Sequence, residues 1–348
     1  MTETTATSEK TATPETTAPI EKTGMTEKIT ADELARAKSI LATIQEAYGA
    51  KVVGQASLRR SLLVGLITGG HVLLESVPGL AKTTAAQAVA DAVSGSFKRI
   101  QCTPDLLPSD IIGTQIFDYT RQTFETQLGP VHANFVLLDE INRSSAKTQS
   151  AMLEAMQERQ TSIGGVVYPL PEPFLVLATQ NPIEQEGTYH LPEAQLDRFL
   201  LRVAFGYPSA DQEWGVLERR MSRRREEQTL DPVTDGPGLL AMQAAVETVT
   251  VDESVGRYCV ALAAATRDHP HVLMGSSPRG ALALMLTGRS YAVIRGRDYV
   301  VPEDVKAVAS AVLGHRITVR PELWMSDVTG AGVVRSVLEQ VPTPGARG

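Results

Sequence analysis

The order of apolar and polar residues along the chain predicts two structural regions. In the first, short runs of aliphatic residues alternate with segments of helical spacing at 82–93 and 146–159. Strands of continuous apolar character that alternate with helices indicate a parallel sheet with helices on both faces. The strand candidates are HVLLES, FKRIQC, FVLLD and FLVLAT, at 71–76, 97–102, 135–139 and 174–179.

The pattern changes after Tyr207, where only helical spacing remains. We therefore expect an α/β domain at 29–206 and a smaller all-α domain without strands at 207–348. The expected helices of the second domain lie at 211–227, 253–267, 279–294, 302–313 and 331–339.

The N-terminal region divides into two parts. Residues 1–28 consist mainly of Thr, Glu, Ala, Lys and Pro, with Ile20 as the only large aliphatic residue. Such a segment cannot bury enough apolar surface to offset its ordering entropy, so we predict a disordered tail. Helical spacing then begins at 31–50, with Thr30 in the position of an N-cap.

Composition narrows the classes of function. The 348 residues are 43% hydrophobic and 21% charged, and 33 basic against 40 acidic residues give a formal net charge of −7. This balance makes nucleic acid an unlikely ligand, although it leaves room for a local basic groove. Cys102 and Cys259 indicate no disulfide framework, which favours a reducing, cytoplasmic location. No apolar run reaches the length of a membrane span.

The first candidate for chemistry lies between the first strand and its helix. A tight turn there can present N–H groups to phosphates, with a lysine at the terminal phosphates and a hydroxyl on Mg²⁺. Lys82 and Thr83 supply these groups, but Ser76 and Ala81 replace the glycines of the strict GxxxxGK[ST] pattern. An ordinary strand–turn–helix connection is therefore an equal alternative. The segment is Ser76, Val77, Pro78, Gly79, Leu80, Ala81, Lys82 and Thr83.

Five further residues follow in the order that a nucleotide hydrolase needs. Asp139 and Glu140 end an apolar strand, where Asp139 would hold Mg²⁺ and Glu140 would deprotonate the attacking water. Asn181 follows the next strand and could orient that water. Arg198, at a helix end on the edge of the sheet away from the phosphate loop, could reach a neighbour's nucleotide, and Arg279, at a helix start, could touch the γ-phosphate. Each has a structural alternative (solvated acids, an Asn-Pro turn, surface arginines), but their joint order favours nucleotide hydrolysis.

These motifs resemble the MoxR group of AAA+ ATPases from about residue 29 to the C-terminus. The most specific stretches are VVGQ, GHVLLESVPGLAKT, LLDEINRSSAKTQSAMLEAMQERQ, LATQNPIEQEGTYHLPEAQLDRF and SPRGALAL. The resemblance implies an AAA+ P-loop αβα domain with a parallel sheet, followed by a smaller all-α lid domain. It also implies nucleotide contacts for Gln55, Ser76, Val77, Pro78, Gly79, Leu80, Ala81, Lys82, Thr83, Thr84 and Arg279, Mg²⁺ contacts for Thr83 and Asp139, and catalytic roles for Glu140, Asn181 and Arg198.

The resemblance carries expectations about the loop and the assembly. A glycine is usual where Ser76 stands, so we expect serine to crowd the turn and Ser76→Gly to tighten ATP binding. Residues 103–118 resemble an insertion in helix 2, and Arg143 is a second candidate for contact with a neighbour.

The implied function is ATP- and Mg²⁺-dependent remodelling of a protein client, with von Willebrand factor A domain proteins as the expected class, by a hexameric ring. A nucleotide-gated scaffold with little turnover and a DNA-remodelling ATPase are the alternatives.

Overall fold

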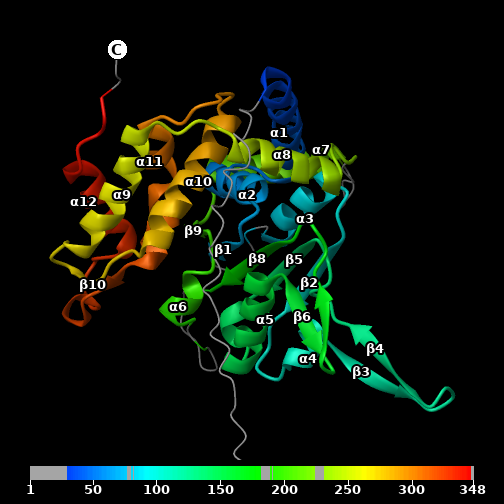
Figure 1. Cartoon of the computed structure of the whole chain (residues 1–348). Helices are drawn as coiled ribbons and strands as arrows, with labels where there is room; N and C mark the ends of the chain where they lie inside the picture. The colour runs from blue at the N-terminus through cyan, green and yellow to red at the C-terminus, as the bar shows by residue number, and fades with distance from the viewer. Residues whose placement is uncertain are drawn as a thin grey trace, which may run out of the picture.

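A five-stranded parallel sheet lies at the centre of the molecule, in the strand order β2-β5-β8-β1-β9 (Figure 1). The computed structural model describes residues 30–76, 80, 82–181, 189, 191–223 and 231–345. All four predicted strands belong to this sheet, and the predicted disordered tail lies outside the described residues. The strands are β1 (Val72–Glu75), β2 (Phe97–Gln101), β5 (Phe135–Asp139), β8 (Leu175–Gln180) and β9 (Leu201–Ala204).

Helices cover both faces of the sheet. In β5, Phe135 and Leu137 pack among the residues of α1, α2 and α3, whereas Val136 and Leu138 pack among those of α4 and α5. This alternation explains the continuous apolar runs and confirms the predicted three-layer αβα fold. The helices are α1 (Ala31–Lys51), α2 (Ala56–Thr68), α3 (Lys82–Ala92), α4 (Pro108–Ile112) and α5 (Ala146–Glu158).

The first helix begins where its cap predicts. Glu33 N donates to Thr30 Oγ1 at 3.2 Å, and Thr30 N donates to Glu33 Oε2 at 2.9 Å, which completes a capping box. The next helix, α2, was not predicted. Most of its side chains are buried, so the sequence shows no polar stripe along it.

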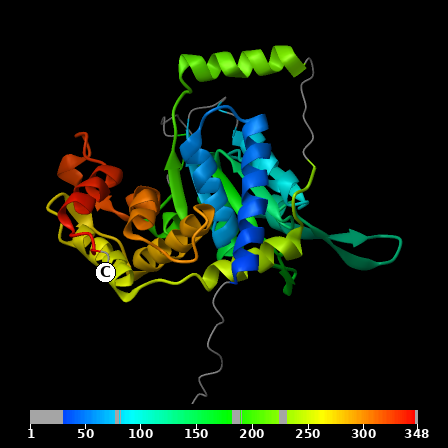
Figure 2. The same ribbon diagram turned by 90° about the horizontal axis from the view of Figure 1, so that it is seen from above.

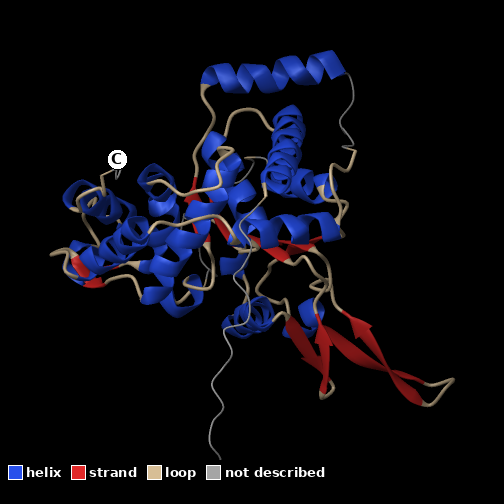
Figure 3. Ribbon diagram, turned by 45° about the horizontal axis from the view of Figure 1, so that its top comes forward, coloured by secondary structure: helices blue, strands red, loops and turns tan. Residues whose placement is uncertain are grey.

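The insertion between β2 and β5 is longer than predicted. The expected range 103–118 covers α4 and β3 (Gly113–Asp118), but β3 pairs with β4 (Thr123–Leu128) in an antiparallel hairpin. This hairpin projects from the core on the side away from the C-terminal helices (Figures 1 and 2). A smaller hairpin, β6 (Gln160–Ile163) with β7 (Val166–Pro169), lies beside its base (Figure 3).

Four helices form the C-terminal lid, close to their predicted ranges. The expectation of no strands after Tyr207 is wrong, because β10 (Val272–Met274) pairs with β11 (Thr318–Val319). Two or three residues are too few to show a strand pattern in the sequence. The lid also contains the 3₁₀ helices η2 (Gly314–Arg316) and η3 (Pro321–Leu323). Its α-helices are α9 (Glu253–Arg267), α10 (Pro278–Ile294), α11 (Pro302–Leu313) and α12 (Gly330–Gln340).

Two helices connect the sheet to the lid. α7 (Ala210–Arg223) touches the end of α1, where Arg219 Nη1 donates to the Gly49 carbonyl, and the rest of its predicted range lies outside the described residues. α8 (Gly236–Glu247), which was not predicted, packs on α2 and donates from Gln243 Nε2 to Leu66 O at 2.7 Å. Because α7 and α8 also contact the helices of the sheet domain, the expected domain boundary between residues 206 and 207 stays a prediction. No helix in the described part of the chain is long and apolar enough to cross a membrane.

Candidate active site

The predicted phosphate, metal and catalytic residues follow neighbouring strands at the carboxyl edge of the sheet. In the strand register, Glu75 lies beside Gln180, and Gln101 lies beside Asp139. Ser76 N donates to Gln180 O at 3.4 Å across the ends of β1 and β8. In an open parallel sheet this edge is where ligands bind.

Lys82 is the first residue of α3 and lies at this edge. Its Nζ donates to Ser76 O at 3.3 Å, and only 8% of the residue is exposed. Burial lowers the pKa of Lys82, and the nearby carboxylates of Asp139 and Glu140 oppose that shift. The ammonium still has donors for phosphate oxygens.

Asp139 is buried, and each oxygen of its carboxylate accepts a hydrogen bond. Its Oδ1 accepts from Thr179 Oγ1 at 2.7 Å, and its Oδ2 accepts from Arg99 Nη2 at 2.5 Å. The Thr179 hydroxyl in turn accepts from Glu140 N at 2.8 Å. Sequence reasoning missed Arg99 and Thr179; the one available signal was a hydroxyl at the end of the apolar run FLVLAT.

Glu140 has a left-handed backbone, with φ of +57°. Such conformations are uncommon for residues with a Cβ and cluster at functional sites. Its Oε2 accepts from Arg143 Nη1 at 3.0 Å and from Gln101 Nε2 at 3.4 Å. Arg143, expected as a candidate for contact with a neighbour, here pairs with the proposed base of its own chain.

The phosphate loop is described only in part. Val77, Pro78, Gly79 and Ala81 lie outside the described residues, whereas Leu80 is buried. Ser76 does not adopt a positive φ, so its own backbone conformation does not require glycine. Residues 77–79 of the turn lie outside the described residues, so the expectation that Ser76→Gly tightens ATP binding stays a prediction.

The described residues beside the phosphate loop fit a bound phosphate group. The buried hydroxyl of Ser76 has no hydrogen-bond partner in the described chain, and Thr83 and Thr84 lie on the first turn of α3. An unpaired buried hydroxyl next to an ammonium and a helix N-terminus matches the needs of a phosphate group.

Two predicted residues flank this region. Gln55 precedes α2 with φ of +53°, and its Nε2 donates to Gly206 O at 3.1 Å. Asn181 directly follows β8, and its carbonyl accepts from Asn142 Nδ2 at 3.3 Å.

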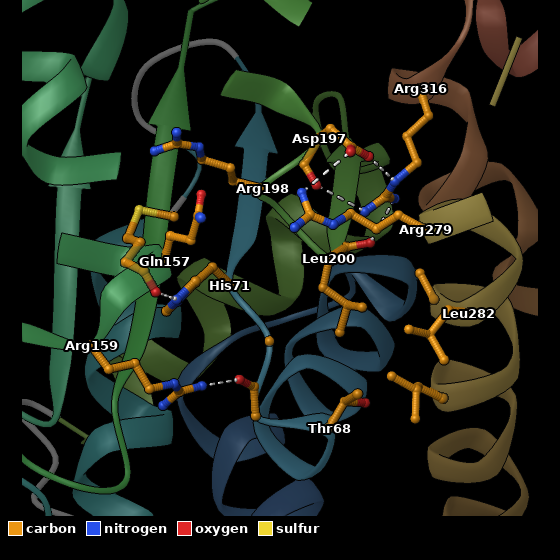
Figure 4. Close-up of a pocket in the computed structure, with 15 residues that line it drawn as sticks. Thr68, His71, Gln157, Arg159, Asp197, Arg198, Leu200, Arg279, Leu282 and Arg316 are labelled. Carbon is orange, nitrogen blue, oxygen red and sulfur yellow. Dashed lines mark hydrogen bonds and ion pairs between the residues drawn. The ribbon is translucent and has the colours of Figure 1, made fainter. Parts of the chain in front are cut away.

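The two predicted arginines lie at the opposite edge of the sheet. Arg198 follows α6 (Glu193–Leu196) and precedes β9, whose first residue is in register with Val72, the first residue of β1. Arg279 lies on the first turn of α10, and its Nη1 is 3.5 Å from Asp197 Oδ2. Both line a pocket of about 300 Å³ together with Asp197 and Arg316 (Figure 4). Neither arginine lies at the edge that carries Lys82 and Asp139.

Comparison with known proteins agrees with this geometry. The profile of the ATPase family associated with various cellular activities (AAA) matches residues 71–201, and that of the AAA lid domain matches residues 264–336. A solved structure from Cytophaga hutchinsonii, assigned as an ATPase, has a TM-score of 0.84 and 41% sequence identity, over 90% of this chain and 98% of that one.

Several curated relatives carry the name MoxR. Chaperone MoxR1 of Mycobacterium tuberculosis is 46% identical over 302 residues, which is 84% of this chain and 79% of the relative. Protein MoxR of Methylorubrum extorquens is 30% identical over 84% of this chain and 92% of its own length. With the parallel sheet, the carboxylate pair and the lid, these similarities show that the chain belongs to the MoxR family of AAA+ ATPases.

Proposed function

We propose that this protein hydrolyses ATP to remodel or mature protein partners, as a homo-oligomeric ring of six subunits in the cytoplasm. The observation that carries the proposal is the separation of the two halves of one active site. Lys82, Asp139 and Glu140 lie at the carboxyl edge of the sheet, and Arg198 and Arg279 lie at the amino edge. A complete site then needs two subunits.

The residues of the carboxyl edge have separate tasks in this proposal. Lys82 and the N-terminus of α3 bind the phosphates of ATP. Thr83 and Asp139 would hold Mg²⁺, and that ion would supply positive charge to the phosphate oxygens. Glu140 takes the proton of the attacking water, and Asn181 orients that water toward the γ-phosphate. To act as a base, Glu140 exchanges its bond to Arg143 for one to the water.

The amino edge serves the neighbouring subunit. A guanidinium supplied in trans stabilises the charge of the transition state. The Arg198 guanidinium makes no hydrogen bond or ion pair with any described residue and is half-buried in a pocket wall, so it is available to a neighbour. Head-to-tail contacts of this kind close into rings.

A protein client accounts for the β3–β4 hairpin. Phe117, Tyr119 and Phe124 form an exposed aromatic cluster on it, with ring centroids 5.2–5.3 Å apart. Exposed apolar clusters on projecting elements are typical of protein contacts. We take a von Willebrand factor A domain protein as the client class. The aromatic cluster and the acidic net charge favour a protein over DNA.

Mixed rings test the proposal. Glu140→Gln should bind ATP but lose turnover by about 10²–10⁴-fold, as expected for loss of a positioned base. Arg198→Ala should also lose turnover. A mixture of the two variants should regain activity, because one subunit supplies the arginine and the other the base. If the mixture stays inactive, the shared site is wrong, and a slow nucleotide-gated scaffold becomes the better description.

A further inference from the structure

The segment that carries Arg198 is tied to the lid by one side chain. Between α6 and β9, the chain at 197–200 is neither helix nor strand, and several of its carbonyls accept from Arg316 of η2. Arg316 Nη2 donates to Phe199 O at 2.8 Å and to Asp197 O at 3.3 Å. Its Nη1 donates to Leu200 O at 3.2 Å.

The same guanidinium also forms an ion pair. Arg316 Nε donates to Asp197 Oδ1 at 2.7 Å, and the Arg316 side chain is only 4% exposed (Figure 4). Burial lowers the pKa of Arg316, and the charge of Asp197 opposes that shift. The planar fork of arginine is suited to several fixed acceptors at once, which lysine cannot match.

A neighbouring histidine strengthens this connection. His315 Nε2 donates to Phe199 O at 3.0 Å, and the His315 side chain is buried. Burial, followed by the charge of Arg316, lowers the pKa of His315 well below its ordinary value, so the ring is neutral. The Phe199 side chain is fully buried in the core below the sheet. The segment is thus fixed by the lid, through Arg316 and His315, and by the core, through the Phe199 side chain.

Arg279 and Arg316, which both approach Asp197, differ in the exposure of their side chains and in the length of their contacts. Arg279 is more than half exposed and approaches Asp197 Oδ2 at 3.5 Å, a long contact, whereas Arg316 is enclosed by its acceptors. A buried ion pair is seldom more stabilising than apolar side chains of the same volume, but it fixes one geometry. Arg316 is therefore better suited to orient the segment than to stabilise the fold.

We propose that Arg316 is a positioning residue for Arg198, the proposed arginine finger. Through Asp197 and the carbonyls of 197–200 it joins the lid to the segment that bears Arg198, so that the lid and the finger move as one unit. A shift of the lid in one subunit then changes the finger presented to the next subunit. This inference rests on the proposed role of Arg198 in the neighbouring site.

The first test separates positioning from stability. Arg316→Met should lower kcat by about 10²-fold, the loss typical of a catalytic group misplaced by about 1 Å. The Kd for a fluorescent N-methylanthraniloyl derivative of ATP should not change, because Lys82 and Thr83 lie at the other edge. Arg297→Met is the matched control: Arg297 pairs with buried Asp304 at 2.6 Å inside the lid and does not touch 197–200. It should lower the thermal midpoint and leave kcat unchanged.

Mixed rings then assign the defect to the finger. Arg316→Met subunits should regain activity when mixed with Glu140→Gln subunits, which supply a correctly placed Arg198. They should not regain activity when mixed with Arg198→Ala subunits, because neither variant then supplies a correctly placed Arg198 guanidinium. Arg316→Lys and Asp197→Asn, which keep more of the contacts, should lower kcat by about 10-fold, and they serve as the test if Arg316→Met does not fold.

The outcomes distinguish the two proposals. Wild-type kcat in Arg316→Met, or in both milder variants, would overturn the positioning role while leaving Arg198 as the finger. Equal loss of kcat in Arg316→Met and Arg297→Met would also overturn it, since the lid as a whole would then be responsible. Wild-type kcat in Arg198→Ala would instead refute the proposed function itself.

Discussion

Thr179 holds the two acids of the active site in a fixed relation. Its hydroxyl donates to Asp139 Oδ1 and accepts from Glu140 N, and the residue is fully buried. A single hydroxyl thereby connects the proposed metal ligand with the strained backbone of the proposed base. Both partners belong to β5 and its turn, whereas Thr179 belongs to β8.

Thr179→Val should lower both stability and turnover. Valine has the same shape but leaves a buried carboxylate oxygen and a buried N–H without their partner, at a cost of about 1–3 kcal/mol. Turnover should fall by about 10–100-fold because the acids lose their alignment. Urea unfolding and steady-state ATPase rates measure these effects. Thr179→Ser keeps the hydroxyl and is the control; equal turnover in the two variants would contradict the role of this hydroxyl.

At the scale of elements, the imidazole of His71 connects three elements through its hydrogen bonds. It precedes β1, its Nε2 donates to Met156 O of α5 at 3.2 Å, and its Nδ1 accepts from Val176 N of β8 at 3.0 Å. This arrangement requires the neutral ring, and burial lowers the pKa of His71 from 6.5 to about 4.

The stability of the protein should fall as pH decreases from about 6.5 to 4. In this window the unfolded chain protonates His71 and the folded chain does not, so the unfolded state binds more protons. The contribution amounts to about 3 kcal/mol at most, and neutral His315 acts in the same direction. Urea unfolding across this pH range measures it. His71→Asn should reduce the slope; a slope identical to that of the wild type would contradict the prediction.

The β3–β4 hairpin is the element we assign to clients. Phe117 and Phe124 face each other across the strands, and Tyr119 is 86% exposed. Such rings are not buried in the described chain, so replacing them should not disturb its folding.

Tyr119→Ser with Phe124→Ser should weaken the binding of fluorescein-labelled casein, an unfolded model client, by about 10-fold or more. Two aromatic contacts of about 1 kcal/mol or more each would be lost. Fluorescence anisotropy measures the binding, and an unchanged thermal midpoint shows that the fold is intact. Val166→Ser with Val167→Ser, on exposed positions of the smaller hairpin, is the control. If both pairs bind casein as the wild type does, the hairpin is not the client site.

At the scale of the whole molecule, Arg198 and Arg279 lie at the edge of the sheet opposite Lys82. If these residues form one site, as we propose, a single subunit is incomplete alone, and the proposal couples catalysis to assembly.

Specific ATPase activity should rise steeply with protein concentration and then level off as rings form. Arginine fingers in related phosphoryl-transfer enzymes contribute about 10³–10⁵ in rate, so the isolated subunit should be nearly inactive. Light scattering on the same dilution series reports the assembly. Arg198→Ala should assemble over the same concentrations without the rise in activity. A rate that does not depend on concentration would favour a solitary switch.

The sequence by itself determined the central strands, most of the longer helices and the order of the proposed active-site residues. Burial on both faces of a parallel sheet demands continuous apolar strands, and this demand is visible in FVLLD and FLVLAT. The lid helices were equally clear, because one side of each faces a core. The motif from Lys82 to Arg279 named the residues of the proposed site, since each lies at or beside the end of an element with its own local pattern.

Only the tertiary structure decided how distant residues meet. The bonds from Gln101 to Glu140, from Arg99 and Thr179 to Asp139, and from Arg316 to 197–200 leave no local pattern. The sequence already placed Arg198 away from the phosphate loop, whereas the position of Arg279 beside Arg198 is seen only in the structure. The direction of parallel strands fixes which end of each strand reaches which edge, and the packing of the lid fixes where Arg279 lies. These relations depend on long-range packing, which neither periodicity nor motif spacing encodes.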